Sequence, residues 1–248
     1  MRGYVVVIPS RYAAERLPGK PLRRIAGKPM LQHVYERAGE SHATQVIIAT
    51  DDERIEAAAQ SFGAEVCMTS PAHRSGTERL AEVAAKLGWV DSQIVVNLQG
   101  DEPLMPGVLI DECAALLDDE RADVATLASA IGEPVDFADP NIVKVVTDDS
   151  EFALYFSRAP IPFSRGAETE LLAMQTARQH HGIYAYRSGT LRAIVASEPA
   201  PLEQCERLEQ LRAMSLGLRI KVGLPTRRPG PGVDTEEDLQ RAEKLLRS

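Results

Sequence analysis

The first half of this 248-residue chain alternates short apolar runs with amphipathic stretches, and this alternation constrains the fold more than any other feature. The apolar runs predict strands at residues 4–8, 45–50, 65–68, 94–98 and 124–128. The intervening stretches predict helices at residues 29–39, 52–62, 77–87 and 106–117. Such alternation is typical of an α/β protein whose mostly parallel sheet is covered on both faces.

The pattern changes after Gly132, where prolines recur and the alternation of helix and strand weakens. Short runs at residues 143–147, 153–157 and 182–186 resemble antiparallel strands. The end of the chain returns to α/β, with a helix at 202–216, a strand at 219–223 and a last helix from Thr235. We therefore predict a single domain over residues 1–248. Its nucleotide-binding part covers about 1–130 and 202–248, and an inserted lobe at about 132–201 binds substrate or forms a dimer.

Basic residues are concentrated at the start of the chain. The first thirty residues hold seven Lys and Arg against one acid, although the whole chain has a formal charge of −8. Arg11, Arg16 and Lys20 follow the first predicted strand in a loop broken by prolines at 18 and 21. Cations on a constrained loop at the end of a buried strand can converge on phosphate groups. The alternative is a solvated charged face.

Composition and missing motifs exclude several classes of protein. Neither the dinucleotide-binding GxGxxG pattern after the first strand nor the P-loop GxxxxGK[ST] pattern is present, since Pro21 follows Gly19 and Lys20. Three widely separated cysteines argue for buried free thiols and against a disulfide framework or a CxxC metal site. The acidic balance argues against a nucleic-acid partner. No apolar run approaches the length of a membrane span, so we expect a cytoplasmic protein without a membrane partner.

Two acids stand where they could hold a metal ion. Asp101 follows the predicted strand at 94–98, at the edge where ligands bind in open parallel sheets. Mg²⁺ commonly uses one or two carboxylates together with substrate phosphates. Asp234 precedes the last helix. Each has a plainer alternative, a turn Asp at 101 and a helix cap at 234, where Thr235 and Asp238 resemble a capping box.

Two further segments, at residues 75–77 and 180–184, carry polar side chains that could bind a ligand. Ser75 and Thr77 open a predicted helix whose free N–H groups could contact a base or an anion, although plain capping explains them equally well. His180 and Tyr184 share one face of a predicted strand, with His181 on the other face. Adjacent histidines suggest zinc, but these two point apart and no third ligand lies nearby in the sequence, so zinc is not favoured.

Taken together, these motifs resemble one family over nearly the whole chain. Residues 8–12 and 16–22 carry a motif shared by sugar nucleotidyltransferases. More specific matches lie at residues 75–79, 97–103, 139–141, 155–158, 180–186, 208–211 and 232–235. The chain resembles the cytidylyltransferases that activate 3-deoxy-manno-octulosonate (Kdo).

The resemblance implies a Rossmann-like nucleotidyltransferase fold, Mg²⁺ as cofactor, and a homodimer that joins CTP and Kdo into CMP-Kdo and pyrophosphate for lipopolysaccharide synthesis. It implies catalytic roles for Arg11, Lys20, Asp101 and Asp234, with the two aspartates holding Mg²⁺. The implied nucleotide-binding residues are Pro9, Ser10, Arg11, Arg16, Lys20, Arg74, Ser75 and Arg79. The implied sugar-binding residues are Gln99, Arg165, His180, Tyr184, Glu209 and Gln210.

Other functions stay open on the sequence. The acceptor could be the 8-amino analogue of Kdo or sialic acid, because one sequence does not define which sugar a pocket selects. A uridylyl- or guanylyltransferase for a sugar phosphate is a further alternative. A catalytically silent nucleotide-binding protein is the alternative from another class. The presence of Lys20, Asp101 and Asp234 together argues against that alternative.

Overall fold

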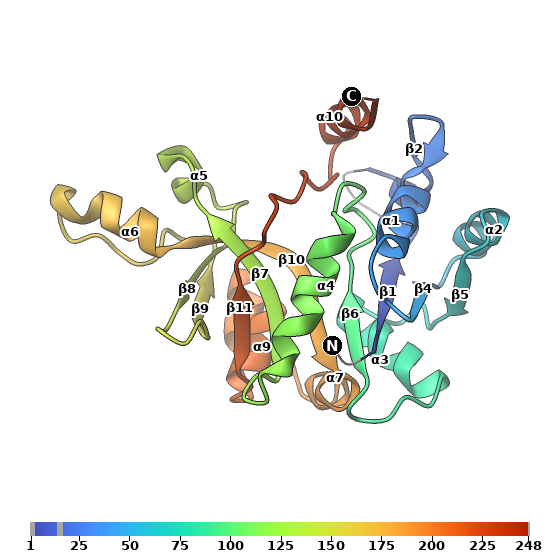
Figure 1. Ribbon diagram of the computed structural model, residues 1–248, viewed down its shortest axis with the longest axis horizontal. Coiled ribbons are helices and arrows are strands. Elements are labelled where there is room, and N and C mark those ends of the chain that lie inside the picture. The colour runs from blue at the N-terminus through green and yellow to red at the C-terminus, as the bar shows by residue number, and fades with distance from the viewer. Residues whose placement is uncertain (1–2, 14–16, 248) are drawn as a thin grey trace.

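The computed structural model describes residues 3–13 and 17–247 (Figure 1). Its strands are β1 (Tyr4–Ser10), β2 (Arg24–Ile25), β3 (Lys28–Pro29), β4 (Gln45–Thr50), β5 (Glu65–Met68), β6 (Ile94–Asn97), β7 (Val124–Ala130), β8 (Lys144–Thr147), β9 (Ala153–Ser157), β10 (Arg178–Arg187) and β11 (Ile220–Gly223). Its α-helices are α1 (Met30–Gly39), α2 (Glu53–Ser61), α3 (Gly76–Lys86), α4 (Gly107–Ala115), α5 (Pro134–Ala138), α6 (Glu170–Thr176), α7 (Ser188–Val195), α8 (Pro201–Glu206), α9 (Gln210–Ser215) and α10 (Glu236–Arg247). Short 3₁₀ turns are η1 (Lys20–Leu22), η2 (Leu116–Asp118) and η3 (Ala167–Thr169).

Within the described residues, nine strands form one sheet whose main path runs β11-β7-β10-β6-β1-β4-β5. Parallel pairs join β11 to β7 and link β6, β1, β4 and β5 in turn. The exception is β10, which is antiparallel to both β6 and β7. The prediction of a mixed, mostly parallel α/β sheet is confirmed.

Helices cover both faces of this sheet because the inner strands are apolar on both sides (Figure 1). Along β1, Tyr4, Val6 and Ile8 pack with α1 and α4, whereas Val5 and Val7 pack with α3, α7 and α9. Successive side chains of a strand point to opposite faces, so one apolar run supplies both cores. Because the helices cover the two faces, the carboxyl ends of the parallel strands remain open to bind a ligand.

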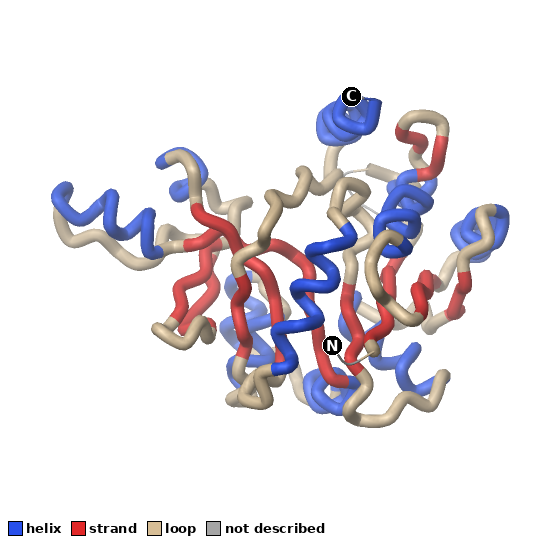
Figure 2. The backbone as a smooth tube through the Cα atoms, in the orientation of Figure 1, coloured by secondary structure: helices blue, strands red, loops and turns tan. Residues whose placement is uncertain are grey.

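An arm extends from the β11 side of the sheet. The hairpin of β8 and β9 pairs with the start of β10, and α5 and α6 project beyond it (Figure 2). The antiparallel strands expected in this region are present. The proposed division at residues 132 and 201 stays a prediction, and β10 lies inside that range although it runs through the middle of the main sheet.

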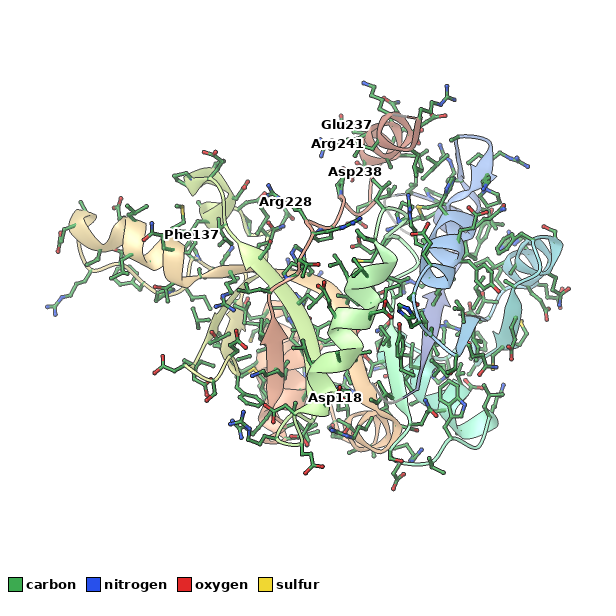
Figure 3. All side chains as sticks on the ribbon, viewed as in Figure 1. Asp118, Phe137, Arg228, Glu237, Asp238 and Arg241 are labelled. Atoms are coloured by element: carbon green, nitrogen blue, oxygen red, sulfur yellow. The ribbon has the colours of Figure 1, made fainter. Side chains whose placement is uncertain are left out.

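A third, smaller core joins the two ends of the chain. Leu17, Ile25 and Met30 pack there against Val233 and Leu239. The segment that crosses from β11 to α10, on which Arg228 lies (Figure 3), brings the last helix back over the first loop. This packing carries Asp234, the neighbour of Val233, towards the residues that follow β1.

Two local predictions were wrong. The helix expected at 202–216 is broken into α8 and α9, because Arg207 adopts a left-handed backbone conformation with a φ of 53°. All three cysteines are free, as predicted, but only Cys113 is buried, and Cys205 is exposed on the short helix α8.

No helix of the described residues is both long enough and apolar enough to cross a membrane.

Candidate functional site

A cavity of about 510 Å³ opens at the carboxyl ends of β1 and β6. The start of α3, the turn η1 and the segment before α10 complete its wall. Predicted site residues that line it are Pro9, Ser10, Arg11, Lys20, Arg74, Ser75, Arg79, Gln99, Asp101, Glu209 and Asp234. Arg16 lies outside the described residues. The cavity therefore unites the basic loop with both candidate metal acids.

Close backbone packing shapes the floor of this cavity. A Cβ at Gly100 would lie 2.7 Å from Ser10 Oγ and 3.0 Å from the Pro9 carbonyl oxygen, so only glycine allows the two segments to approach this closely. Gly19 has a φ of 67°, which turns the first loop into η1. That turn places Lys20 on the cavity wall.

Lys20 lies between the two aspartates. Its Nζ donates to Asp101 Oδ2 at 2.7 Å and to Asp234 Oδ1 at 2.8 Å. The lysine side chain is only 12% exposed, whereas the Asp101 and Asp234 side chains are 35% and 48% exposed. Burial acts to lower the pKa of Lys20, but the two carboxylates outweigh it and raise that pKa above its ordinary value. Lys20 is therefore a cation at neutral pH, held at the point where the two carboxylates meet.

The cap of the last helix is formed by residues next to Asp234. Asp238 accepts hydrogen bonds from the backbone N–H of Thr235 and from its hydroxyl, and the Asp238 N–H donates to Thr235 Oγ1. This reciprocal pair is a capping box with Thr235 at its start. The side chain of Asp234 instead faces Lys20. Thr235 and Asp238 thus cap the helix, and whether Asp234 holds a metal ion stays a prediction.

The start of α3 forms the opposite wall. Ser75 caps the helix by accepting from the Glu78 N–H at 3.2 Å, and a Cβ on Gly76 would lie 3.2 Å from Pro9 Cγ. Arg79 reaches the cavity but its guanidinium hydrogen-bonds Thr69 and lies 3.2 Å from Asp51 Oδ2. These partners tie Arg79 to the ends of β4 and β5. The plain capping role foreseen for Ser75 is present.

The predicted sugar residues do not all reach the cavity. Gln99 and Glu209 line it, and Glu209 Oε2 accepts from Thr77 Oγ1 at 2.8 Å. Burial raises the pKa of Glu209. Gln210 lines a much smaller cavity behind, together with Thr77, Tyr186 and Glu209.

The other three predicted sugar residues line neither cavity. Tyr184 and His180 are packed ring against ring at 5.2 Å within the sheet. His180 Nε2 lies 3.0 Å from Thr126 Oγ1, and burial lowers the pKa of the imidazole to about 3. Arg165 is exposed just before η3 on the arm. The structure thus places Gln99 and Glu209 on the wall of the large cavity, places Gln210 in the smaller cavity behind it, and does not bring Arg165 to either.

Known cytidylyltransferases are similar to this chain over nearly its whole length. The profile of the family described as cytidylyltransferase matches residues 5–220. A 3-deoxy-manno-octulosonate cytidylyltransferase of Actinobacillus pleuropneumoniae serotype 7 (strain AP76) is 51% identical over 247 residues, which cover 98% of this chain and 99% of that protein. The enzyme of the same name from Thioalkalivibrio sulfidiphilus is 50% identical over 248 residues, covering 99% of both chains.

The chain belongs to the 3-deoxy-manno-octulosonate cytidylyltransferase family.

Solved structures support the same assignment. A CMP:2-keto-3-deoxy-manno-octonic acid synthetase complexed with CTP superposes with a TM-score of 0.90 at 44% identity, covering 99% of this chain and 98% of that one. A 4-diphosphocytidyl-2C-methyl-D-erythritol synthase from Anaerococcus prevotii shares only the fold, with a TM-score of 0.63 at 14% identity. The resemblance seen in the sequence motifs is confirmed, and the chain is a nucleotidyltransferase.

The structure of this cytidylyltransferase adds site residues that sequence reasoning did not assign. His73 lines the cavity beside Arg74. Glu102 lies behind Asp101, where burial and the negative charge of Asp101 raise the pKa of its carboxyl to about 8. The acidic pair at 101 and 102 is visible in the sequence, but only the fold shows that the second acid is partly buried.

Unpartnered buried polar atoms mark the region around the cavity. In the described part of the chain, Ser10 Oγ, Asn97 Oδ1, Tyr184 Oη and Gln210 Nε2 lack a hydrogen-bond partner. Asn97 and Tyr184 are cross-strand neighbours on β6 and β10, and Ser10 lines the cavity. Because a buried polar atom without a partner costs free energy, Ser10 Oγ, which is on the cavity wall, is suited to a hydrogen bond with a ligand.

Proposed function

We propose that this protein transfers the cytidylyl group of CTP to Kdo, giving CMP-Kdo and pyrophosphate. Support comes from the relatives named 3-deoxy-manno-octulosonate cytidylyltransferase, which are 50% and 51% identical to this chain over nearly its full length. The similar synthetase structure complexed with CTP gives further support. The observation that carries the proposal is Lys20 held between Asp101 and Asp234 in one cavity. This arrangement provides positive charge for a triphosphate and carboxylates for its metal ion.

The reaction joins the anomeric oxygen of the sugar to the α-phosphorus of CTP and breaks the bond from that phosphorus to the pyrophosphate oxygen. The sugar hydroxyl loses its proton, and pyrophosphate leaves with the electron pair of the broken bond. Such transfers depend on positioning and charge neutralisation more than on a covalent nucleophile. In the proposed mechanism Arg11 and Lys20 hold the triphosphate, and Pro9, Ser10, Arg74 and Ser75 contact the nucleoside.

We assign Mg²⁺ to Asp101 and Asp234. Two half-exposed carboxylates that meet at one cation suit a divalent ion that keeps several waters and uses phosphate oxygens as further ligands. When bound, Mg²⁺ would withdraw charge from the phosphates and lower the pKa of a coordinated hydroxyl. In the proposed site Lys20 leaves the carboxylates for the phosphates when nucleotide arrives. Removal of divalent ions should therefore abolish turnover.

The sugar is proposed to lie between Gln99, Glu209 and Gln210, with Tyr184 and His180 supporting that side of the cavity from the sheet. Arg165 is exposed on a loop of the arm and does not line the cavity. Kdo and its 8-amino analogue differ at one group, so the assay must include both.

A homodimer is proposed through the arm. Phe163, Leu171 and Leu172 there expose 87%, 61% and 61% of their surface, and Val135 and Leu154 are also exposed. Large exposed apolar side chains concentrated in one region indicate an interaction surface. Light scattering coupled to gel filtration tests this assignment. We also propose a role in lipopolysaccharide synthesis, in the cytoplasm.

A pyrophosphate-release assay tests the function directly. CTP, UTP and GTP are each combined with Kdo, 8-amino-Kdo and sialic acid, with and without Mg²⁺. The proposal expects product with CTP and Kdo in the presence of Mg²⁺. Stoichiometric CTP binding without product from any acidic sugar would support a silent nucleotide-binding protein instead.

A further inference from the structure

The wall of the cavity before α3 is a loop of residues 69–75 that has no strand or helix of its own. His73, Arg74 and Ser75 of this loop line the cavity. A segment without regular backbone hydrogen bonds needs other partners to keep one conformation. The face of α3 that lies under the loop provides them.

Glu82 of α3 makes the central contacts. Its Oε2 accepts from the backbone N–H of Ser70 at 2.8 Å and lies 2.5 Å from His73 Nε2. Its Oε1 pairs with Lys86 Nζ at 2.8 Å, and the same ammonium donates to the Met68 carbonyl oxygen at 2.6 Å. One carboxylate therefore holds both the beginning of the loop and the imidazole on the cavity wall.

Neighbouring residues of α3 hold the two ends of the same loop. Glu78 Oε2 accepts from the Arg74 N–H at 2.7 Å, and Arg79 binds Thr69. Glu82 lies four residues after Glu78, three after Arg79 and four before Lys86, so these side chains share one side of the helix. Through them α3 holds Thr69, Ser70, His73 and Arg74 of the loop.

We propose that Glu82 is a positioning residue that fixes the nucleoside side of the cavity and thereby sets the affinity for CTP. The inference rests on the proposed function, since it assumes that the nucleotide occupies the cavity. Glu82 does not line the cavity among the described residues, so it acts through Ser70 and His73. Partial burial acts to raise the pKa of Glu82, but hydrogen bonds from Lys86, Ser70 and His73 lower it to about 2. The carboxylate is thus charged at every working pH.

The loop held by Glu82 should affect the binding of CTP and not the chemical step. The loop contacts a part of the nucleotide that does not react, so it binds the ground state and the transition state alike. Loosening it should raise the KM for CTP while leaving kcat unchanged. The KM for the sugar, which is assigned to the other side of the cavity, should also be unchanged.

The test compares Glu82→Ala, Glu82→Gln and the control Glu56→Gln, which alters a glutamate on the surface of α2 away from the cavity. We expect Glu82→Ala to raise the KM for CTP on the order of tenfold, because binding must then order the loop. Glu82→Gln keeps an acceptor for the Ser70 N–H and should give a smaller increase. The control should match the wild type.

Hydrogen exchange of residues 69–75 provides a readout that does not require turnover. Glu82→Ala should speed exchange in this segment, and His73→Ala combined with it should raise the KM by less than the product of the two single effects. Unchanged exchange, unchanged KM for CTP, or equal increases in KM for both substrates would each overturn the proposal. If the wild-type protein forms no product from CTP, the proposed function fails, and CTP titrations by calorimetry on the same variants still decide the role of Glu82.

Discussion

Replacing Lys20 with Met should lower turnover and strengthen metal binding at the same time. Methionine keeps most of the length and apolar stem of the lysine but removes its charge. Lys20 Nζ lies 2.7 and 2.8 Å from two carboxylate oxygens, so it contacts both proposed metal ligands directly. In the reaction the same charge would face the phosphates.

The magnitude for turnover follows from the loss of one preorganised charge at the reacting group. Such a loss costs about 3 kcal/mol in the transition state, which corresponds to at least about a hundredfold in kcat. The effect on stability should be smaller, about 1 kcal/mol, because Asp101 and Asp234 are one third to one half exposed and stay solvated.

The affinity of the protein for Mg²⁺ should rise in the same variant. Without Lys20 the two carboxylates repel each other and lose the cation that competes with the metal, so the nucleotide-free variant should bind Mg²⁺ about tenfold more tightly. Calorimetric titration of Mg²⁺ into the purified protein measures this change, and pyrophosphate release measures turnover.

Lys28→Met is the matched control, because Lys28 belongs to the same basic segment but pairs with Glu36 on the surface. It should leave both quantities unchanged. Turnover within threefold of the wild type in a folded Lys20→Met protein would refute the catalytic role. Weaker Mg²⁺ binding would refute the competition between lysine and metal.

Further predictions concern the carboxylates and the helix cap. Asp101→Asn should lower kcat at least about a hundredfold, and a steady-state assay with saturating Mg²⁺ checks it. Asp234→Asn should raise the Mg²⁺ concentration needed for half-maximal rate with little change in urea unfolding, whereas Thr235→Ala should cost about 1 kcal/mol of stability at an unchanged Mg²⁺ requirement. Glu82 has a lowered pKa in the folded state, so its contribution to stability is complete above about pH 4.5 and is lost as the pH falls towards 2. Unfolding curves should therefore show a steeper acid loss for the wild type than for Glu82→Gln.

The strands and helices of the sheet could be predicted because each depends on a hydrophobic pattern within a few consecutive residues. The strand predicted at residues 45–50 and observed as β4 has the same bounds, since a short apolar run between turn signals specifies a buried strand. The convergence of Lys20 and Asp101 was also predictable. Both follow parallel strands, and the carboxyl ends of such strands meet at one edge of the sheet.

Other features depend on contacts that sequence does not display. The break at Arg207 could not be predicted, because a left-handed residue that is not glycine has no compositional signal. Arg79 has the charge and the place for a nucleotide contact, yet Asp51 and Thr69 engage it once β4 and β5 are paired. Arg165 was assigned from motif similarity alone, and its surroundings on the arm give no local pattern that fixes its position.

The position of β10 determines how far the protein can be dissected. This ten-residue strand pairs with β7 along most of its length, with β8 of the arm at residues 178–179, and with β6 at residues 184–187. A shortened protein lacking residues 132–201 would lose the partner of both neighbouring strands and expose two unpaired edges in the middle of the sheet. The inserted lobe predicted at residues 132–201 therefore cannot be removed as a module to leave a folded minimal enzyme.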